Sequence, residues 1–216
     1  MTKAVRLDSA DRRHPRHGGG RLFAVAIVVA LLIMTVIRHF FIDVYYIPSE
    51  SMQPAYEPGD RIVVSKTQHD ISRGDVVVVN GEGSFAPYRP ASYAWSHPID
   101  TTLRFFALKG DDNVYIKRVI GVGEDTVECC ENNRLLVNGH PVEEPYLLDD
   151  NFASEQKFKV TVPEGKLWLM GDNRAHSRDS RALLGQPGGG FIAEDSVLGE
   201  PILRLWPPDR FGQLTP

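Results

Sequence analysis

Two serines one residue apart stand in a proline-rich segment that runs from Ile47 to Pro54. Proline lacks a backbone donor and disfavours helical geometry in the residue before it, so the segment is expected to be extended. Side chains two residues apart in an extended chain share a face, which would place Ser49 and Ser51 on the same side. A serine hydroxyl in a fixed position becomes a nucleophile when a base lies next to it.

Lys117 is the base that the sequence offers, within Tyr115–Gly121, an apolar run typical of a strand. Burial lowers the pKa of a lysine, so its neutral amine can take a proton from a serine. Taken singly, each residue has a simpler interpretation, because serines beside proline commonly lie in turns and strand lysines commonly face solvent. Together, Ser51 and Lys117 suggest a serine–lysine dyad.

A third polar segment, residues 171–181, follows an expected strand and contains Asp172, Ser177, Asp179 and Arg181. One interpretation is a surface turn closed by exposed Asp–Arg pairs, which contribute little to stability. The other is a support for the dyad, in which Ser177 hydrogen-bonds the lysine amine while Asp179 and Arg181 keep the turn in shape.

The segment that precedes the first serine is expected to be a membrane anchor. Leu22 to Ile37 is uncharged and dominated by Ala, Val, Ile and Leu. Extended to Ile42, it is long enough for a hydrocarbon core of about 30 Å at about 1.5 Å per residue. We therefore predict one transmembrane helix over residues 21–42. A cleaved secretory signal is the alternative, but Arg, His and Phe follow the apolar core where small residues would mark a cleavage site.

Residues 1–20 are basic and polar and end in three glycines, the composition of a disordered tail. Because excess Lys and Arg mark the cytoplasmic flank of a membrane span, this tail is expected in the cytoplasm. Residues 43–216 would then form an extracytoplasmic, β-rich domain.

Beyond the anchor, short apolar runs alternate with turn residues, which is typical of a β domain. We predict a mainly β fold, an antiparallel β-sheet catalytic domain after one N-terminal transmembrane helix. Residues 80–113 lack regular alternation and are expected to be a long insertion. The predicted strands are Arg61–Lys66, Val76–Val79, Tyr115–Val122, Thr126–Glu131, Leu135–Val137, Phe158–Val162, Leu167–Met170 and Leu198–Leu205.

Composition excludes several functional classes. The chain has 216 residues and a formal net charge of -4, which gives no electrostatic reason to expect nucleic acid as a partner. Its two cysteines, Cys129 and Cys130, are adjacent and are expected as thiols on opposite faces of a strand, with a vicinal disulfide as the alternative. The seven histidines form no metal-binding motif, so neither a metal nor a cofactor is predicted.

Four motifs occur in one order along the chain: Pro48-Ser49-x-Ser51-Met52-x-Pro54, Arg73-Gly74-Asp75-Val76-Val77, Tyr115-Ile116-Lys117-Arg118, and Gly171-Asp172-Asn173-Arg174 through Ser180-Arg181. One such motif would be weak evidence, whereas the ordered set is specific. The set resembles that of bacterial type I signal peptidases, also called leader peptidases, which are membrane-anchored serine proteases that act on exported proteins.

The resemblance implies that Ser51 is the nucleophile and Lys117 the general base. It further implies an oxyanion hole made by the Ser51 backbone N–H and the Ser49 hydroxyl, with Ser177 orienting Lys117. A lysine as the base resembles the bacterial form of the enzyme, since the endoplasmic-reticulum form uses histidine at this place. Two departures are Glu50, where many members have glycine, and Ala175-His176, where Asp-Asn is more usual.

The resemblance also implies a substrate and a place of action. Expected substrates are exported preproteins, cut after Ala-x-Ala-like sites to release their N-terminal signal peptides. The enzyme would act on the outer face of the bacterial cytoplasmic membrane as a single-pass protein. Apolar residues beside the dyad, Ile47, Met52 and Ile116, are expected to line shallow pockets for small side chains, with Tyr45 at a more distant pocket. Ordinary core packing is the alternative for each of them.

Two other functions fit parts of the pattern. A self-cleaving repressor resembles the dyad but needs a DNA-binding half, for which the sequence gives no support. A membrane-tethered β module that binds exported proteins without cutting them would not need Ser51.

Overall fold

The structure is a computed structural model that describes residues 18–67, 70–88, 96–147 and 152–214. The chain divides into two compact units, Met1–His39 and Phe40–Pro216. Most of the predicted tail, residues 1–17, lies outside the described residues.

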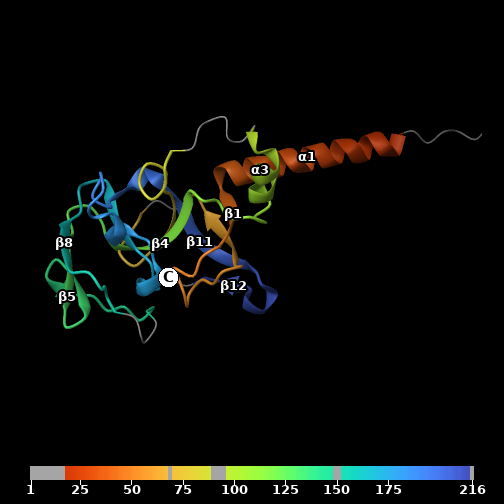
Figure 1. The fold of residues 1–216 in the computed structure, drawn as a ribbon. Helices are drawn as coiled ribbons and strands as arrows, with labels where there is room; N and C mark the ends of the chain where they lie inside the picture. The colour runs from red at the N-terminus through yellow and green to blue at the C-terminus, as the bar shows by residue number, and fades with distance from the viewer. Residues whose placement is uncertain (1–17, 68–69, 89–95, 148–151, 215–216) are drawn as a thin grey trace, which may run out of the picture. The chain divides into compact units, whose positions relative to one another are not determined.

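The first unit contains helix α1, Gly18–Phe40, apart from the last residue of this helix (Figure 1). Within it, Gly20–Phe40 has a mean hydropathy of 2.6 and is the one helix, among the described residues, long and apolar enough to cross a membrane. Its 21 residues span about 32 Å, which matches a hydrocarbon core of about 30 Å. The side chains of Leu22 and Phe23 are 73% and 70% exposed. A helix that is apolar on all sides and exposed is suited to lipid.

An eight-stranded antiparallel sheet forms the larger part of the second unit, in the order β1-β2-β11-β3-β4-β9-β10, with β12 paired to β11. Its strands are β1 (Ile42–Tyr46), β2 (Arg61–Ser65), β3 (Val76–Asn80), β4 (Val114–Gly121), β9 (Lys166–Met170), β10 (Ile192–Ala193), β11 (Val197–Trp206) and β12 (Gly212–Gln213).

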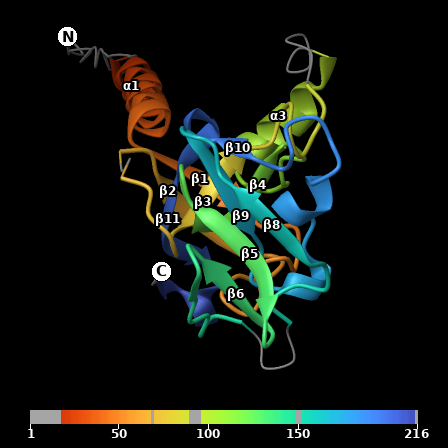
Figure 2. The ribbon, with the colours of Figure 1, turned by 90° about the vertical axis from the view of Figure 1, so that its left-hand side faces the viewer.

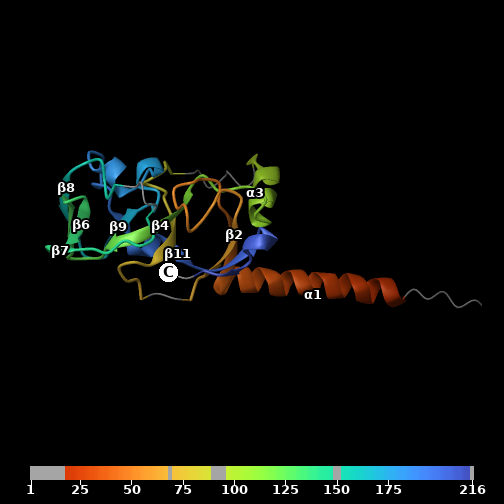
Figure 3. The same cartoon turned by 90° about the horizontal axis from the view of Figure 1, so that it is seen from below.

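A second antiparallel sheet has the order β7-β6-β5-β8. Its strands are β5 (Thr126–Glu131), β6 (Arg134–Val137), β7 (His140–Pro141) and β8 (Phe158–Thr161). Figures 1 and 3 place this smaller sheet at one end of the unit, with β1 and β2 of the larger sheet towards the other end. Figure 2 shows β5 and β8 from the front, before β9 and β4.

Strand β3 shows why the central strands are apolar throughout. Successive side chains of a strand point to opposite faces. Val76 and Val78 pack with one buried cluster, which includes Met52 and Ile116, while Val77 and Val79 pack with another. Both faces of this strand are therefore covered, and the neighbouring β4, which includes Lys117, is fixed in the core beside it.

The predicted fold class is confirmed, because the domain is mainly β and antiparallel. Each of the eight predicted strands is present. Asn132 and Asn133 join β5 to β6, and both have positive φ, as a tight hairpin turn requires. The short strands β1, β7, β10 and β12 were not predicted, because runs such as Ile42–Tyr46 contain polar residues or are too brief to show alternation.

Two local features differ from the expectation. Helix α3, Pro98–Phe105, forms between β3 and β4, where irregular structure was expected. Pro98 stands in its first turn, where its missing N–H does no harm. In β5, Cys129 and Cys130 form a disulfide, so the expectation of two free thiols is wrong and the alternative applies.

Candidate active site

Ser51 begins a turn within the proline-rich segment and is only 5% exposed. The segment is fixed at its start, where the Ile47 N–H donates to Asp60 and the Ile47 carbonyl accepts from Gly59. Ser49 Oγ lies 3.3 Å from Ser51 Oγ, so the two hydroxyls share one side, as the extended segment predicts. Glu50, which stands between the two serines where many family members have glycine, is exposed.

Lys117 approaches Ser51 from strand β4. Its Nζ lies 2.7 Å from Ser51 Oγ and donates a second hydrogen bond to the Ile116 carbonyl at 2.8 Å. The residue is 3% exposed. The structure therefore brings together the two side chains that the sequence separates by 66 positions.

Burial lowers the pKa of Lys117 from 10.5 to about 8. Asp179 and Asp172 act in the opposite direction, because a nearby negative charge favours the ammonium form, while Arg181 again lowers the pKa. At pH 7, the neutral amine is then about 300-fold more abundant than for an ordinary lysine. A useful fraction of Lys117 is able to accept a proton near neutral pH.

This shift predicts the pH dependence of any reaction that uses Lys117 as a base. Only the neutral amine accepts a proton, so kcat/KM should rise about tenfold per pH unit below the pKa of about 8 and level off above it. Peptide hydrolysis rates measured from pH 5 to 10 test for this rise of kcat/KM with pH. A profile that is flat across this range would contradict Lys117 as the base.

The loop after β9 contacts the backbone of Ser51. The Asn173 N–H donates to the Ser51 carbonyl oxygen at 3.1 Å. Gly171 lies against the same carbonyl, because a Cβ atom there would stand 2.5 Å from that oxygen and would also strike Ser177. A side chain at position 171 would displace Ser51, which accounts for glycine in this motif.

Asp172 and Arg118 form an ion pair in the core. Arg118 Nε and Nη2 donate to the two carboxylate oxygens at 2.9 and 2.8 Å, and the side chains are 4% and 0% exposed. Burial raises the pKa of Asp172, and the bonds from Arg118 offset only part of this rise. Such a pair is stable only while both partners remain, because either one alone would be a buried, uncompensated charge.

Asp179 and Arg181 form the second support of this loop. Arg181 Nε and Nη2 donate to Asp179 at 2.8 and 2.7 Å, and Asp179 also accepts from the Gly171 N–H at 3.0 Å. Burial alone would raise the pKa of Asp179, but Arg181 and the Gly171 N–H lower it below its ordinary value. The expected shaping of the turn by these two residues therefore has a direct structural basis.

The structure does not contain the hydrogen bond expected between Ser177 and Lys117. Ser177 Oγ is buried, and its hydroxyl acts on Asp179 instead, where it helps to lower the pKa of that carboxyl. Lys117 Nζ bonds Ser51 and the Ile116 carbonyl instead. The backbone carbonyl thus takes the second contact of the amine, and an orienting role of Ser177 remains a prediction.

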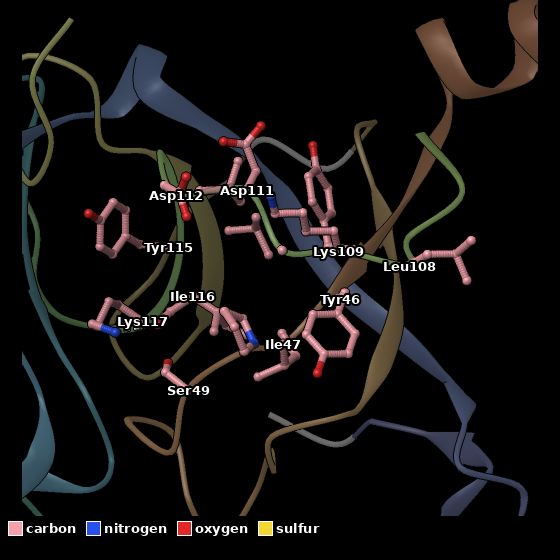
Figure 4. Close-up of a pocket in the computed structure, with 15 residues that line it drawn as sticks. Tyr46, Ile47, Ser49, Leu108, Lys109, Asp111, Asp112, Tyr115, Ile116 and Lys117 are labelled. Carbon is pink, nitrogen blue, oxygen red and sulfur yellow. Dashed lines mark hydrogen bonds between the residues drawn. The ribbon is translucent and has the colours of Figure 1, made fainter. Parts of the chain in front are cut away.

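A cavity of about 490 Å³ opens beside Lys117 (Figure 4). In Figure 4, Lys117 and Ser49 lie at one end of the cavity and Leu108 at the other. The lining residues are Tyr45–Ser49, Val78, Leu108–Asp112 and Val114–Lys117. Two chain segments, the one after β1 and strand β4, thus flank a space that leads to the dyad.

Three of the four predicted pocket residues, Tyr45, Ile47 and Ile116, line this cavity. Met52 does not, because the chain turns inward after Ser51 and places this side chain, 0% exposed, in the core with Ile47 and Ile116. The expectation for Met52 is therefore corrected to core packing.

Several residues of the site were not assigned a role from the sequence. Leu108 and Lys109 belong to the segment between β3 and β4 and line the cavity. Arg118 and Asn173 stand within recognised motifs, but nothing in the motifs reveals their partners. Only the three-dimensional arrangement shows that one binds Asp172 and the other binds the Ser51 carbonyl.

A hydroxyl beside a buried amine with a lowered pKa, at the end of an open cleft in a mainly β domain, has the components of a serine peptidase.

Comparison with known proteins agrees with this class. The family model described as signal peptidase, peptidase S26, matches residues 21–206. The chain is 35% identical over 240 residues to signal peptidase I of Mycobacterium tuberculosis (strain H37Rv), covering 98% of this chain and 80% of the relative. It is 34% identical over 199 residues to signal peptidase I T of Bacillus subtilis (strain 168), covering 87% and 86%.

A solved structure of signal peptidase I from Enterococcus faecalis V583 matches with 24% identity and a TM-score of 0.40, covering 61% of this chain and 96% of that one. Because the family model extends over most of the sequence, the chain belongs to the S26 family of signal peptidases. It is therefore a hydrolase of a serine peptidase family.

Proposed function

We propose that this chain is a membrane-anchored endopeptidase that removes N-terminal signal peptides from exported preproteins after Ala-x-Ala-like sites. Ser51 is the nucleophile and Lys117 the general base. The observation that supports this assignment is the 2.7 Å separation of Lys117 Nζ from Ser51 Oγ in a buried position beside an open cleft.

In the first half of the reaction, Lys117 takes the Ser51 proton as the serine oxygen attacks the scissile carbonyl carbon. The tetrahedral intermediate collapses, the C–N bond breaks, and Lys117 gives the proton to the leaving amine. The signal peptide is then joined to Ser51 as an ester. In the second half, Lys117 takes a proton from water, which attacks the ester carbonyl, and returns the proton to Ser51.

The Ser49 hydroxyl and the Ser51 backbone N–H are the proposed oxyanion donors. The position of Ser49 Oγ, 3.3 Å from the nucleophile oxygen, supports this role. Ser49→Ala is expected to lower kcat about 100-fold with a small change in KM, because the lost hydrogen bond acts mainly on the transition state. Steady-state hydrolysis of a peptide measures both constants. Ser49→Thr retains a hydroxyl and is the matched control, and an unchanged kcat for Ser49→Ala would exclude the role.

Substrate choice follows from the residues nearest the dyad. Ile47, Ile116 and Tyr45 all contribute to the lining of the cleft. An extended peptide between the segment after β1 and strand β4 would direct alternate side chains towards these residues. Small residues such as alanine at the first and third positions before the cut fit such an arrangement.

Helix α1 and the basic residues before it support the proposed topology. Its length suits one crossing of the bacterial cytoplasmic membrane, with the N-terminus in the cytoplasm and the domain outside. The bilayer and exported preproteins are thus the proposed partners, and Ser177 is proposed to assist Lys117 from the loop after β9.

The decisive experiment offers the purified full-length protein in detergent a peptide with a single Ala-x-Ala site and determines the cut position by mass spectrometry. We expect cleavage directly after the second alanine. The same peptide, unable to cross the membrane, should be cut by intact spheroplasts that contain the protein. Cleavage only after lysis would contradict the outer location, and no cleavage in detergent would contradict the proposed activity.

A further inference from the structure

The segment after β7 places a buried carboxylate against the loop that contacts Ser51. Glu144 forms an ion pair with Arg174, and their side chains are 7% and 2% exposed. Arg174 in turn donates to the Gly171 carbonyl at 3.1 Å and to the Ala153 carbonyl at 2.9 Å. The charge of Glu144 therefore fixes an arginine that holds the start of this loop.

Tyr146 lies two residues further on and contacts the other arginine of the site. The Arg118 guanidinium lies over its ring, with the guanidinium carbon 3.9 Å from the ring centroid. Its hydroxyl donates to Glu144 at 3.0 Å. A guanidinium over an aromatic face is attracted by the ring, and more strongly where water is excluded. Glu144 and Tyr146, here called the outer brace, thus connect the two arginines.

Both arginines act on the short segment 171–174. Arg118 fixes the Asp172 carboxylate with two hydrogen bonds, and Arg174 fixes the Gly171 carbonyl. Between them, the Asn173 N–H binds the Ser51 carbonyl. A displacement of this segment would therefore move the nucleophile relative to Lys117.

We propose that Glu144 and Tyr146 are positioning residues for the nucleophile, acting through Arg174 and Arg118 on the loop that binds the Ser51 backbone. This inference rests on the proposed function of Ser51 and Lys117. The cavity beside the dyad is lined by neither residue of the outer brace. Loss of the outer brace should therefore reduce the rate of the chemical step without weakening peptide binding.

The experiment compares kcat and KM for Glu144→Gln, Tyr146→Leu and Tyr146→Phe in the full-length protein. For Glu144→Gln and Tyr146→Leu we expect kcat to fall tenfold or more, with KM within threefold of the parent. Tyr146→Phe keeps the ring over Arg118 but loses the hydroxyl's bond to Glu144, so its kcat should fall less than that of Tyr146→Leu, with KM within threefold of the parent. Glu143→Gln is the matched control, because this neighbouring carboxylate is 84% exposed and pairs with Arg134 at the surface.

Circular dichroism and thermal unfolding establish that each variant is folded at the assay temperature. If Glu144→Gln leaves Arg174 without its partner and prevents folding, Tyr146→Leu decides the question, because it removes no charge. The proposal is overturned if the folded variants keep the kcat of the parent, or if their KM rises while kcat is unchanged. Retained cleavage by Ser51→Ala would instead overturn the proposed function, so the two failures are distinguishable.

Discussion

Ser51→Ala is expected to reduce cleavage of an Ala-x-Ala peptide by about 10⁴-fold or more, to the background rate. The methyl group cannot attack the carbonyl carbon, and Lys117 then has no nucleophile to activate. The fold should persist, because the Ser51 carbonyl, which binds Asn173, belongs to the backbone and remains in place. Peptide hydrolysis and circular dichroism of the purified variant measure the two effects.

Ser72→Ala is a matched control for this substitution, since Ser72 is an exposed serine in the connection between β2 and β3. It should leave the rate unchanged. A folded Ser51→Ala variant that still cleaves would assign the chemistry to another residue. Retained peptide binding without cleavage in the parent protein would instead favour a tethered β module that binds exported proteins.

The dyad could be predicted because each member lies in a recognisable local context. Proline on both sides of the two serines implies an extended segment, and the apolar residues around Lys117 imply a buried strand. The structure adds what local context cannot give, namely the distance between residues 66 positions apart. That distance depends on how the larger sheet brings β4 against the segment that follows β1.

The large strands were equally accessible from sequence. Val76–Val79 and most of Tyr115–Val122 consist of Val, Ile and Tyr, which favour strands. The structure buries both faces of Val76–Val79. Strand β1, by contrast, contains Asp43 and two tyrosines, and only its pairing with β2 makes it a strand. Helix α3 has only 8 residues, none of them buried, which is too short a stretch for a helical period to stand out in the sequence.

The supports of the site were the least predictable part. Ser177 was expected to bind Lys117, yet the Ile116 carbonyl lies where the amine makes its second bond. Met52 was expected at the cleft, but the turn after Ser51 directs it into the core. Glu144 and Tyr146 stand in none of the four motifs. Their partners, Arg174 and Arg118, come from segments distant in the sequence, so no local pattern reveals these contacts. Such contacts depend on tertiary packing.

Lys117→Met should abolish cleavage to a similar degree, because the thioether cannot accept the Ser51 proton. Removing either member of a unit that acts together costs nearly the whole effect of the unit. We expect kcat/KM to fall by about 10⁴-fold or more at every pH, and its rise with pH towards the pKa of about 8 to disappear. Lys159→Met is the matched control, because Lys159 lies on strand β8 with its side chain 66% exposed. Substantial cleavage by folded Lys117→Met would place the base elsewhere.

The same substitution should stabilise the protein at neutral pH. Burial disfavours the ammonium form of Lys117, so its pKa falls from 10.5 in the unfolded chain to about 8 in the folded protein. At 1.36 kcal/mol per pKa unit, this difference costs about 3 kcal/mol of folding free energy. The cost is complete below the folded pKa, declines as the pH rises, and vanishes above the unfolded value. Denaturant unfolding compares the free energy of unfolding of the parent and of Lys117→Met. The variant should be more stable, with a gain that is largest below pH 8 and disappears near pH 11. A loss of stability that does not depend on pH would mean that the amine is a structural group rather than a buried base.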